Sequence, residues 1–134
     1  MKAIATKPLP VPAPPAPVIV VVDDDPAVCG SLKFLLELDG FTVRAYSGAD
    51  ELLDDKQFDN VSCFVIDQRM PVTTGMELIA KLRSKKILTP AILLVSHPNV
   101  AVSDRAAKAA IPVIEKPLLG NALVETIRAL CQRV

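Results

Sequence analysis

The sequence is poor in three features that would each indicate a particular class of protein: cysteine, unbalanced charge and long apolar runs. Its three cysteines, Cys29, Cys63 and Cys131, lie far apart and form no Cys-x-x-Cys pair. A disulfide framework or a zinc site is therefore not expected, and reduced, mostly buried thiols are. Lysine and arginine together number 15, as do aspartate and glutamate, so the net charge does not favour nucleic acid or an anionic membrane as a partner.

No apolar run approaches the ~20 residues that a membrane helix needs. Prolines from Pro8 onward also interrupt any signal-peptide core. With 134 residues, the chain is long enough for one domain with its own core. We therefore expect a cytoplasmic protein that binds neither a membrane nor nucleic acid.

Proline is concentrated at the start of the chain, where residues 8–17 read Pro-Leu-Pro-Val-Pro-Ala-Pro-Pro-Ala-Pro. Such a segment cannot form ladder hydrogen bonds and is expected to be extended or disordered. It contains a Pro12-x-x-Pro15 match, but a plain tail is favoured over a docking ligand. We therefore divide the chain into a tail of residues 1–17 and one domain of residues 18–134.

After the tail, short apolar runs alternate with stretches of helical periodicity. The runs typical of strands are residues 18–22, 41–46, 61–67, 91–95 and 111–115. The helical stretches begin near residues 25, 47, 74, 99 and 118. Strict alternation implies an α/β fold, a parallel sheet with helices on both faces. Pro112 lacks a backbone donor, which predicts that the fifth strand lies at a border of the sheet.

Polar residues at the helix starts predict how the helices are capped. Asp25, Ser47 and Asn99 are each expected to cap a helix, and Thr74 opens a capping box with Glu77. The apolar face predicted for the first helix consists of Val28, Leu32, Leu35 and Leu36. The last helix is expected over residues 118–133, with Leu123, Ile127 and Leu130 on one face.

Charged and polar side chains follow four of the expected strands, at the edge where ligands bind in parallel sheets. They are Asp23 and Asp24, Asp67, Ser96, and Lys116. Carboxylates held close together repel one another unless a cation neutralises them, and a hard divalent cation such as Mg²⁺ fits oxygen ligands. Asp67 could then act as a nucleophile and form an aspartyl-phosphate. Lys116 and Ser96 could neutralise or donate to the phosphoryl oxygens.

Four motifs in this order resemble those of response-regulator receiver domains of two-component signalling, and their spelling is most similar to FixJ-type receivers. They are Val22-Asp23-Asp24-Asp25-Pro26, Ile66-Asp67-x-Arg69-Met70-Pro71-x-x-x-Gly75, Val95-Ser96 and Ile114-Glu115-Lys116-Pro117. The resemblance covers about residues 18–133. It implies a doubly wound, flavodoxin-like (βα)₅ fold with strand order 2-1-3-4-5. It also implies phosphoryl transfer to Asp67 from a histidine kinase or phosphotransfer protein.

The resemblance further implies a role for each site residue. The Mg²⁺ ligands would be two direct carboxylates, one carboxylate acting through water and one backbone carbonyl: Asp24 and Asp67, Asp23, and Arg69. Ser96 and Lys116 would hold the phosphoryl group, and a cis peptide is expected between Lys116 and Pro117. A homodimer through the fourth helix, fifth strand and fifth helix also fits the resemblance.

Several residues depart from the usual pattern. His97 follows the hydroxyl where receivers usually have a small residue, and Pro98 comes next. Together with Arg69 they flank the expected path to Asp67 and should modulate access to it. His97 could also be a phosphorelay histidine or a metal ligand, but an exposed loop residue is favoured because Mg²⁺ prefers oxygen. Val113 stands where many receivers have a switch Tyr or Phe. The segment from Ser96 to Lys116 is also short, which predicts a truncated fourth helix, so the usual relay cannot operate.

We therefore expect a single-domain response regulator that signals through an unidentified protein partner and catalyses only its own phosphorylation and dephosphorylation. No DNA-binding segment follows Val134, so direct control of transcription is not expected. Two alternatives stay open. One is a small haloacid-dehalogenase-like phosphatase, because Asp23-x-Asp25 resembles that family's nucleophile motif, although a cap and a second acidic motif are missing. The other is an adaptor whose receiver fold no longer switches.

Overall fold

The computed structural model describes residues 15–118 and 120–132. Strands and helices alternate along the described chain, as predicted. The strands are β1 (Val18–Val22), β2 (Thr42–Tyr46), β3 (Val61–Asp67), β4 (Ala91–Val95) and β5 (Val113–Glu115). The helices are α1 (Pro26–Leu38), α2 (Ala49–Asp55), α3 (Gly75–Ser84), α4 (Val100–Lys108) and α5 (Ala122–Cys131). The expectation for residues 1–14 lies outside the described residues.

The strands form one parallel sheet in the order β2-β1-β3-β4-β5, which confirms the predicted fold class. Val22, the last residue of β1, pairs with Tyr46 on one side and Ile66 on the other. The register therefore brings the ends of the central strands to one edge of the sheet. β5 is a border strand, as Pro112 predicts, and the Pro112 carbonyl accepts a hydrogen bond from the Leu93 N–H (2.9 Å).

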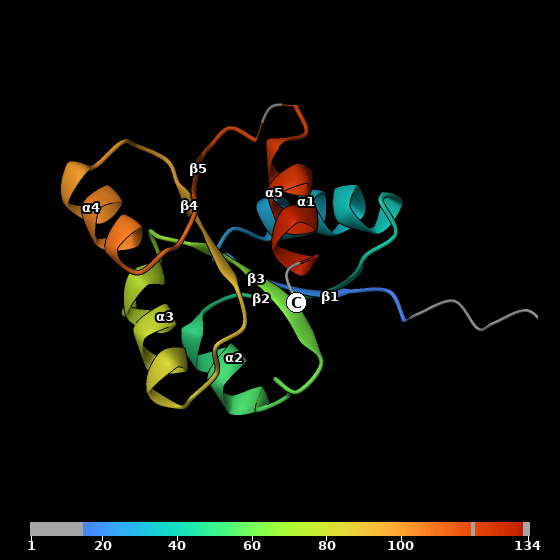
Figure 1. Ribbon diagram of the computed structural model, residues 1–134, viewed down its shortest axis with the longest axis horizontal. Helices are drawn as coiled ribbons and strands as arrows, with labels where there is room; N and C mark the ends of the chain where they lie inside the picture. Colours follow the sequence, from blue (N-terminus) through green and yellow to red (C-terminus); the bar gives the residue numbers. More distant parts are fainter. Residues whose placement is uncertain (1–14, 119, 133–134) are drawn as a thin grey trace, which may run out of the picture.

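Helices cover both faces of the sheet: α1 and α5 pack on one face, and α2, α3 and α4 on the other (Figure 1). Successive side chains of β3 alternate between the two cores, because Phe64 lies in one cluster and Val65 in the other. A strand covered on both faces needs apolar residues at consecutive positions, which explains the uninterrupted run in β3. Each large buried side chain contributes about 1.5–3 kcal/mol to folding.

Three of the predicted helix caps are present. The Asp25 carboxylate accepts a hydrogen bond from the Ala27 N–H (2.9 Å), and the Asn99 side chain accepts one from the Val102 N–H (3.2 Å). Thr74 and Glu77 form the predicted capping box at the start of α3. These caps fix where α1, α3 and α4 leave the edge of the sheet that carries the polar residues.

The prediction that Ser47 caps the second helix is wrong, because the cap residue is Gly48, with no side-chain cap bond. The Glu51 carboxylate instead reaches back and accepts hydrogen bonds from the N–H and the hydroxyl of Ser47. The acidic side chain in the first turn thus binds the residue before the cap, and its negative charge lies at the positive end of the helix dipole.

Several further boundaries and one face differ from the sequence prediction; β2, for example, begins at Thr42 and not at residue 41. α5 begins at Ala122 and not at residue 118, because Gly120 takes a positive φ of 72° and turns the chain first. β5 begins at Val113, after Pro112. Leu35 of α1 is 38% exposed and does not belong to the buried face that Leu32 and Leu36 form. None of the described helices has the length and the hydropathy required to cross a bilayer.

Candidate functional site

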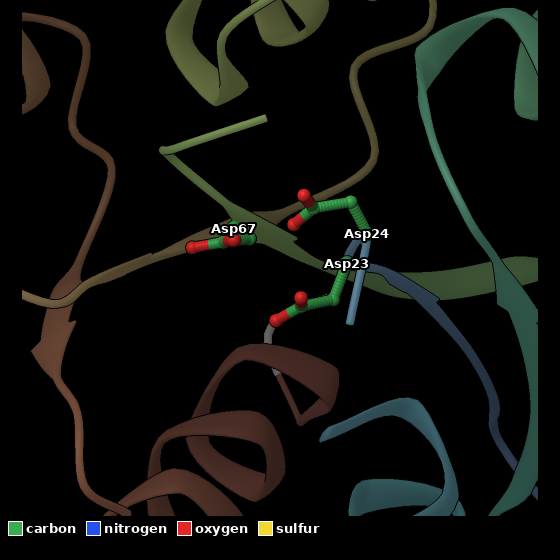
Figure 2. Close-up of side chains that lie close together, drawn as sticks. All are labelled: Asp23, Asp24 and Asp67. Carbon is green, nitrogen blue, oxygen red and sulfur yellow. The ribbon is translucent and has the colours of Figure 1, made fainter. Parts of the chain in front are cut away.

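Three carboxylates meet at the edge of the sheet formed by the strand ends. Asp23 and Asp24 follow β1, and Asp67 is the last residue of β3. One carboxylate oxygen from each lies within 4.8 Å of the other two (Figure 2). Asp23 and Asp67 are buried, with 1% and 3% of their surface exposed, whereas Asp24 is exposed. Asp23 and Asp67 thus lie at the boundary of the hydrophobic core, and Asp24 is in contact with solvent.

Asp23 is held in place by contacts on both of its carboxylate oxygens. Oδ1 accepts a hydrogen bond from the Asp25 N–H (2.9 Å), and Oδ2 accepts one from Lys116 Nζ (2.8 Å). Its backbone N–H donates to the Tyr46 carbonyl at the end of β2 (3.1 Å). The Cys29 thiol lies 3.2 Å from its carbonyl oxygen. These contacts tie the acidic turn to β2, α1 and the residue that follows β5.

Lys116 connects two of the carboxylates. Its Nζ lies 2.8 Å from Asp23 Oδ2 and 3.3 Å from Asp67 Oδ1. Burial alone would lower the pKa of Lys116, but the hydrogen bond to Asp23 and the charges of Asp67 and Asp23 outweigh it and raise the pKa above its usual value. The ammonium is therefore charged at neutral pH. The peptide bond between Lys116 and Pro117 is cis, as the resemblance implies.

Asp67 is the least satisfied of the three carboxylates. Its Oδ1 is buried and accepts no hydrogen bond from any described residue, although the Lys116 ammonium lies nearby. Burial and the negative charge of Asp23 raise the pKa of Asp67, while Lys116 and a backbone hydrogen bond from Arg69 lower it by less. A buried oxygen without a hydrogen bond costs about 1–3 kcal/mol, and the ion pair with Lys116 offsets part of that cost. The arrangement therefore fits a hard cation, which would supply charge and a ligand bond to this oxygen.

Ser96 lies at the same edge, after β4, but makes no side-chain hydrogen bond within the described part of the chain. It lines a hollow of about 230 Å³ together with Arg69 and His97. The side chains of all three residues are exposed, as is Pro98 in the same loop. The structure thus places the predicted access residues around a hollow beside the end of β3, without joining Ser96 to Asp67.

The position of α3 relative to the site depends on Gly75. This glycine ends the second receiver motif, but the sequence alone predicts no role for it. A Cβ atom at this position would lie 2.6 Å from the Asp67 carbonyl oxygen and 2.7 Å from Leu93 Cδ1. The Gly75 N–H donates to the Gln68 carbonyl (3.0 Å), and Gln68 Oε1 accepts from the Met76 N–H (2.9 Å). A glycine directly after a helix cap was the signal, because it marks a close backbone approach.

Comparisons with known proteins identify relatives of this chain. A family model described as the response regulator receiver domain matches residues 19–128. The transcriptional regulatory protein FixJ of Rhizobium meliloti (strain 1021) is 35% identical over 108 residues, which cover 80% of this chain and 53% of FixJ. FixJ of Azorhizobium caulinodans is 36% identical over 110 residues, covering 81% of this chain and 52% of that protein.

The chain therefore spans about half the length of these curated relatives. A crystal structure of FixJ-N superposes with a TM-score of 0.77 and is 31% identical, covering 88% of this chain and 95% of that one. Strand order, the carboxylate cluster and the sequence relationship lead to the same assignment. This chain belongs to the response regulator receiver domain family of two-component systems.

Proposed function

We propose that Asp67 accepts a phosphoryl group from a histidine kinase or phosphotransfer protein. Receiver domains generally signal and do not turn over external substrates, and this proposal assigns the same role to this chain. The observation that carries it is Asp67 Oδ1, a buried carboxylate oxygen that accepts no hydrogen bond of good geometry from the described residues and lies 3.3 Å from the Lys116 ammonium. Contact with a cation or an electrophilic group lowers the free-energy cost of keeping this charged oxygen buried.

Mg²⁺ would be held by Asp24, Asp67 and the backbone carbonyl of Arg69, with Asp23 acting through water. The close approach of the three carboxylates supports this ligand set. When bound, the ion neutralises charge on the carboxylates and on the transferred group. Asp23 has a second role, because it positions the Lys116 ammonium beside Asp67.

The transfer requires a defined exchange of bonds. A carboxylate oxygen of Asp67 forms the new bond to phosphorus, while the phosphorus–nitrogen bond of the donor phosphohistidine breaks and its electron pair returns to the imidazole nitrogen. Lys116 donates to one outer oxygen of the phosphoryl group, which carries the spread negative charge of the transition state. Its position between Asp23 and Asp67 supports this role.

Ser96 would respond to the new group. Its hydroxyl is exposed and not engaged within the described residues, so it is free to donate to a phosphoryl oxygen. A hydrogen bond to a charged group contributes about 1.5–3 kcal/mol. That is enough to change a two-state equilibrium about ten- to a hundredfold. Movement of the loop that carries Ser96, His97 and Pro98 would then alter contacts with a downstream protein.

The same geometry argues against Asp23 as a phosphatase nucleophile. Both Asp23 carboxylate oxygens are engaged, one by a backbone N–H and one by Lys116. A nucleophile needs an oxygen that can reach phosphorus. Asp67, with its unbonded oxygen, meets that requirement better. The homodimer through α4, β5 and α5 and the cytoplasmic location remain predictions.

Intact mass after incubation with Mg²⁺ and acetyl phosphate tests the proposal. The expected result is one added phosphoryl group in the wild-type chain and none in Asp67→Asn. Asp59→Asn is the matched control, because Asp59 is an exposed turn residue outside the site, and it should be modified normally. Equal modification of Asp67→Asn, or none of the wild type, would refute the assignment.

Beryllofluoride separates a switching receiver from a non-switching adaptor. With Mg²⁺ and beryllofluoride, a switching receiver should show amide shift changes in the segment from Ser96 to α4, and Ser96→Ala should reduce them. A modified Asp67 with an unchanged loop would instead support the adaptor alternative.

A further inference from the structure

Gln68, the residue directly after Asp67, is bound to its surroundings at three points. Its N–H donates to the Leu94 carbonyl of β4 (2.8 Å), and its carbonyl accepts from the Gly75 N–H at the start of α3 (3.0 Å). Its side-chain Oε1 accepts from the next N–H along the helix, that of Met76 (2.9 Å). Any residue could make the two backbone bonds, but the third requires a side-chain acceptor of this length.

The start of α3 shows what the side chain of Gln68 adds. The N–H groups in the first turn of a helix have no acceptor within the helix. Gln68 supplies the acceptors for the first two, those of Gly75 and Met76. The Thr74 hydroxyl accepts from the third, that of Glu77 (3.2 Å). The Thr74 bond holds α3 to its own cap residue, whereas the bonds to Gln68 hold α3 to the end of β3.

The bonds to Gln68 close the base of a short loop, residues 69–74. A backbone hydrogen bond from Arg69 to Asp67 places the start of this loop against the carboxylate cluster. Its middle is a three-residue turn centred on Val72, which has a φ of 69°, and a hydrogen bond of 2.7 Å joins the first and last residues of the turn. A branched residue rarely adopts a left-handed backbone, so the turn is strained. Such strain persists only where the surrounding structure holds the segment in place.

We propose that Gln68 is a positioning residue for the metal site, because its side chain fixes the base of the 69–74 loop and thereby holds the Arg69 carbonyl in place. This inference rests on the proposed function, which makes that carbonyl a Mg²⁺ ligand. Mg²⁺ requires nearly octahedral geometry with ligands at about 2.0–2.1 Å, so a displaced carbonyl is a lost ligand. Removing a group that orients a metal ligand typically lowers the metal affinity about 10- to 100-fold.

A Mg²⁺ titration followed by amide NMR, without any phosphoryl donor, tests the proposal. Gln68→Met keeps the length of the side chain but removes its acceptor, and it should raise the dissociation constant for Mg²⁺ about tenfold. Gln68→Asn is one methylene shorter, so its amide cannot reach the Met76 N–H. It should weaken Mg²⁺ binding in the same direction, because the loop that carries the Arg69 carbonyl is again released at its base.

Thr74→Val is the matched control, since it removes the other side-chain cap of the same helix, at the end of the same loop. Loss of a cap should destabilise the domain in both Thr74→Val and Gln68→Met, as urea unfolding measures. Only Gln68→Met should weaken Mg²⁺ binding, because the Thr74 hydroxyl does not join α3 to β3.

Hydrogen exchange of the metal-free chain gives a second readout. The Met76 amide should exchange about fivefold faster in Gln68→Met, relative to the Leu78 amide, because it loses one hydrogen bond. Leu78 is the internal reference, since its N–H donates to the Thr74 carbonyl (2.9 Å). Gln68→Glu keeps an acceptor at the same reach and should leave the Met76 amide as protected as in the wild type.

The outcomes separate this inference from the proposed function. If the wild-type chain does not bind Mg²⁺, the proposed ligand set is wrong, and the positioning role of Gln68 is wrong with it. If the wild type binds Mg²⁺ and Gln68→Met binds it equally well, only the positioning role is overturned. The same holds if Thr74→Val weakens Mg²⁺ binding as much as Gln68→Met, or if exchange of the Met76 amide does not change in Gln68→Met.

Discussion

The ammonium of Lys116 lies closer to Asp23 than to Asp67: Nζ is 2.8 Å from Asp23 Oδ2 and 3.3 Å from Asp67 Oδ1. Asp23, whose other oxygen is bound by the Asp25 N–H, thus acts as the anchor of the lysine. Asp67 keeps a buried oxygen without a hydrogen bond among the described residues. Asp23 therefore holds the lysine ammonium in place, and Asp67 keeps an oxygen available to bind a metal ion or a phosphoryl group.

Lys116→Ala should destabilise the domain, because it leaves the buried Asp23 and Asp67 without their cation. Removing one partner of a buried pair costs about 3–5 kcal/mol, and for a lysine that is 19% exposed we expect about 2 kcal/mol. Urea unfolding measures the loss, and millimolar Mg²⁺ should recover part of it. Lys33→Ala, at an exposed position of α1, is the control and should change stability by less than about 0.5 kcal/mol. A Lys116→Ala chain as stable as wild type would contradict the buried pair.

Asp67→Asn should stabilise the metal-free domain at pH 7 and should lose this advantage in acid. Burial and the charge of Asp23 raise the pKa of Asp67 in the folded state above the ordinary value of 3.8. Below the ordinary pKa the Asp67 carboxyl is protonated in both states and does not affect stability. The cost of ionising it in the folded state grows as the pH rises from the ordinary to the raised pKa, and it is constant above the raised pKa. The gain at pH 7 should be about 1 kcal/mol. Thermal unfolding at pH 3 and pH 7 checks it, and Asp59→Asn should show no such pH dependence.

Gly75→Ala should destabilise the domain and slow modification of Asp67. Its methyl group would lie 2.6 Å from the Asp67 carbonyl oxygen, so the start of α3 must move away from β3. Overpacking of this kind costs about 1–3 kcal/mol. Gly30→Ala is the matched control: nothing lies within 4 Å of its Cβ, and alanine inside a helix should stabilise the chain by about 0.5–1 kcal/mol. Opposite signs for the two variants in urea unfolding are the expected result.

Val72→Asn should stabilise the domain. Val72 has a φ of 69°, in the left-handed region, and its side chain is 94% exposed, so it gains no burial in return. A left-handed backbone costs a branched residue about 1–2 kcal/mol, and asparagine tolerates it better. We expect a gain of about 1 kcal/mol in the free energy of unfolding. Val100→Asn, at a site 78% exposed with a helical backbone, should show no comparable gain.

The architecture could be predicted from the sequence because several independent local signals agree. Apolar runs marked the strands, Pro112 marked the border, and Thr74 with Glu77 marked the start of α3. Convergence of Asp23, Asp24 and Asp67 followed from parallel topology alone, since the ends of parallel strands meet at one edge. The strand order came from the family resemblance and not from the residues.

Other features depended on contacts between side chains, which a linear pattern does not contain. Ser47 has the right chemistry for a cap, but Glu51 binds it from the next turn. The helical spacing of Leu35 predicts a core position, but its side chain lies at the edge of the helix face that packs on the sheet and is partly exposed. Gly75 appears in the motif, but only the packing of α3 against Asp67 shows why a side chain is excluded there.

The border strands of the sheet have a consequence for how the molecule behaves in crowded solution. β5 is three residues long and is preceded by Pro112, which has no N–H to offer a neighbouring chain. At the opposite border, Arg44 of β2 donates to the Gln57 carbonyl and lies 3.9 Å from Asp55, which places charge along that strand. Short, charged or proline-flanked edges resist strand pairing between molecules. The two edge strands therefore protect the sheet against fibrillar aggregation. Because the inner strands are paired on both sides, they can be fully apolar without exposing a hydrophobic edge.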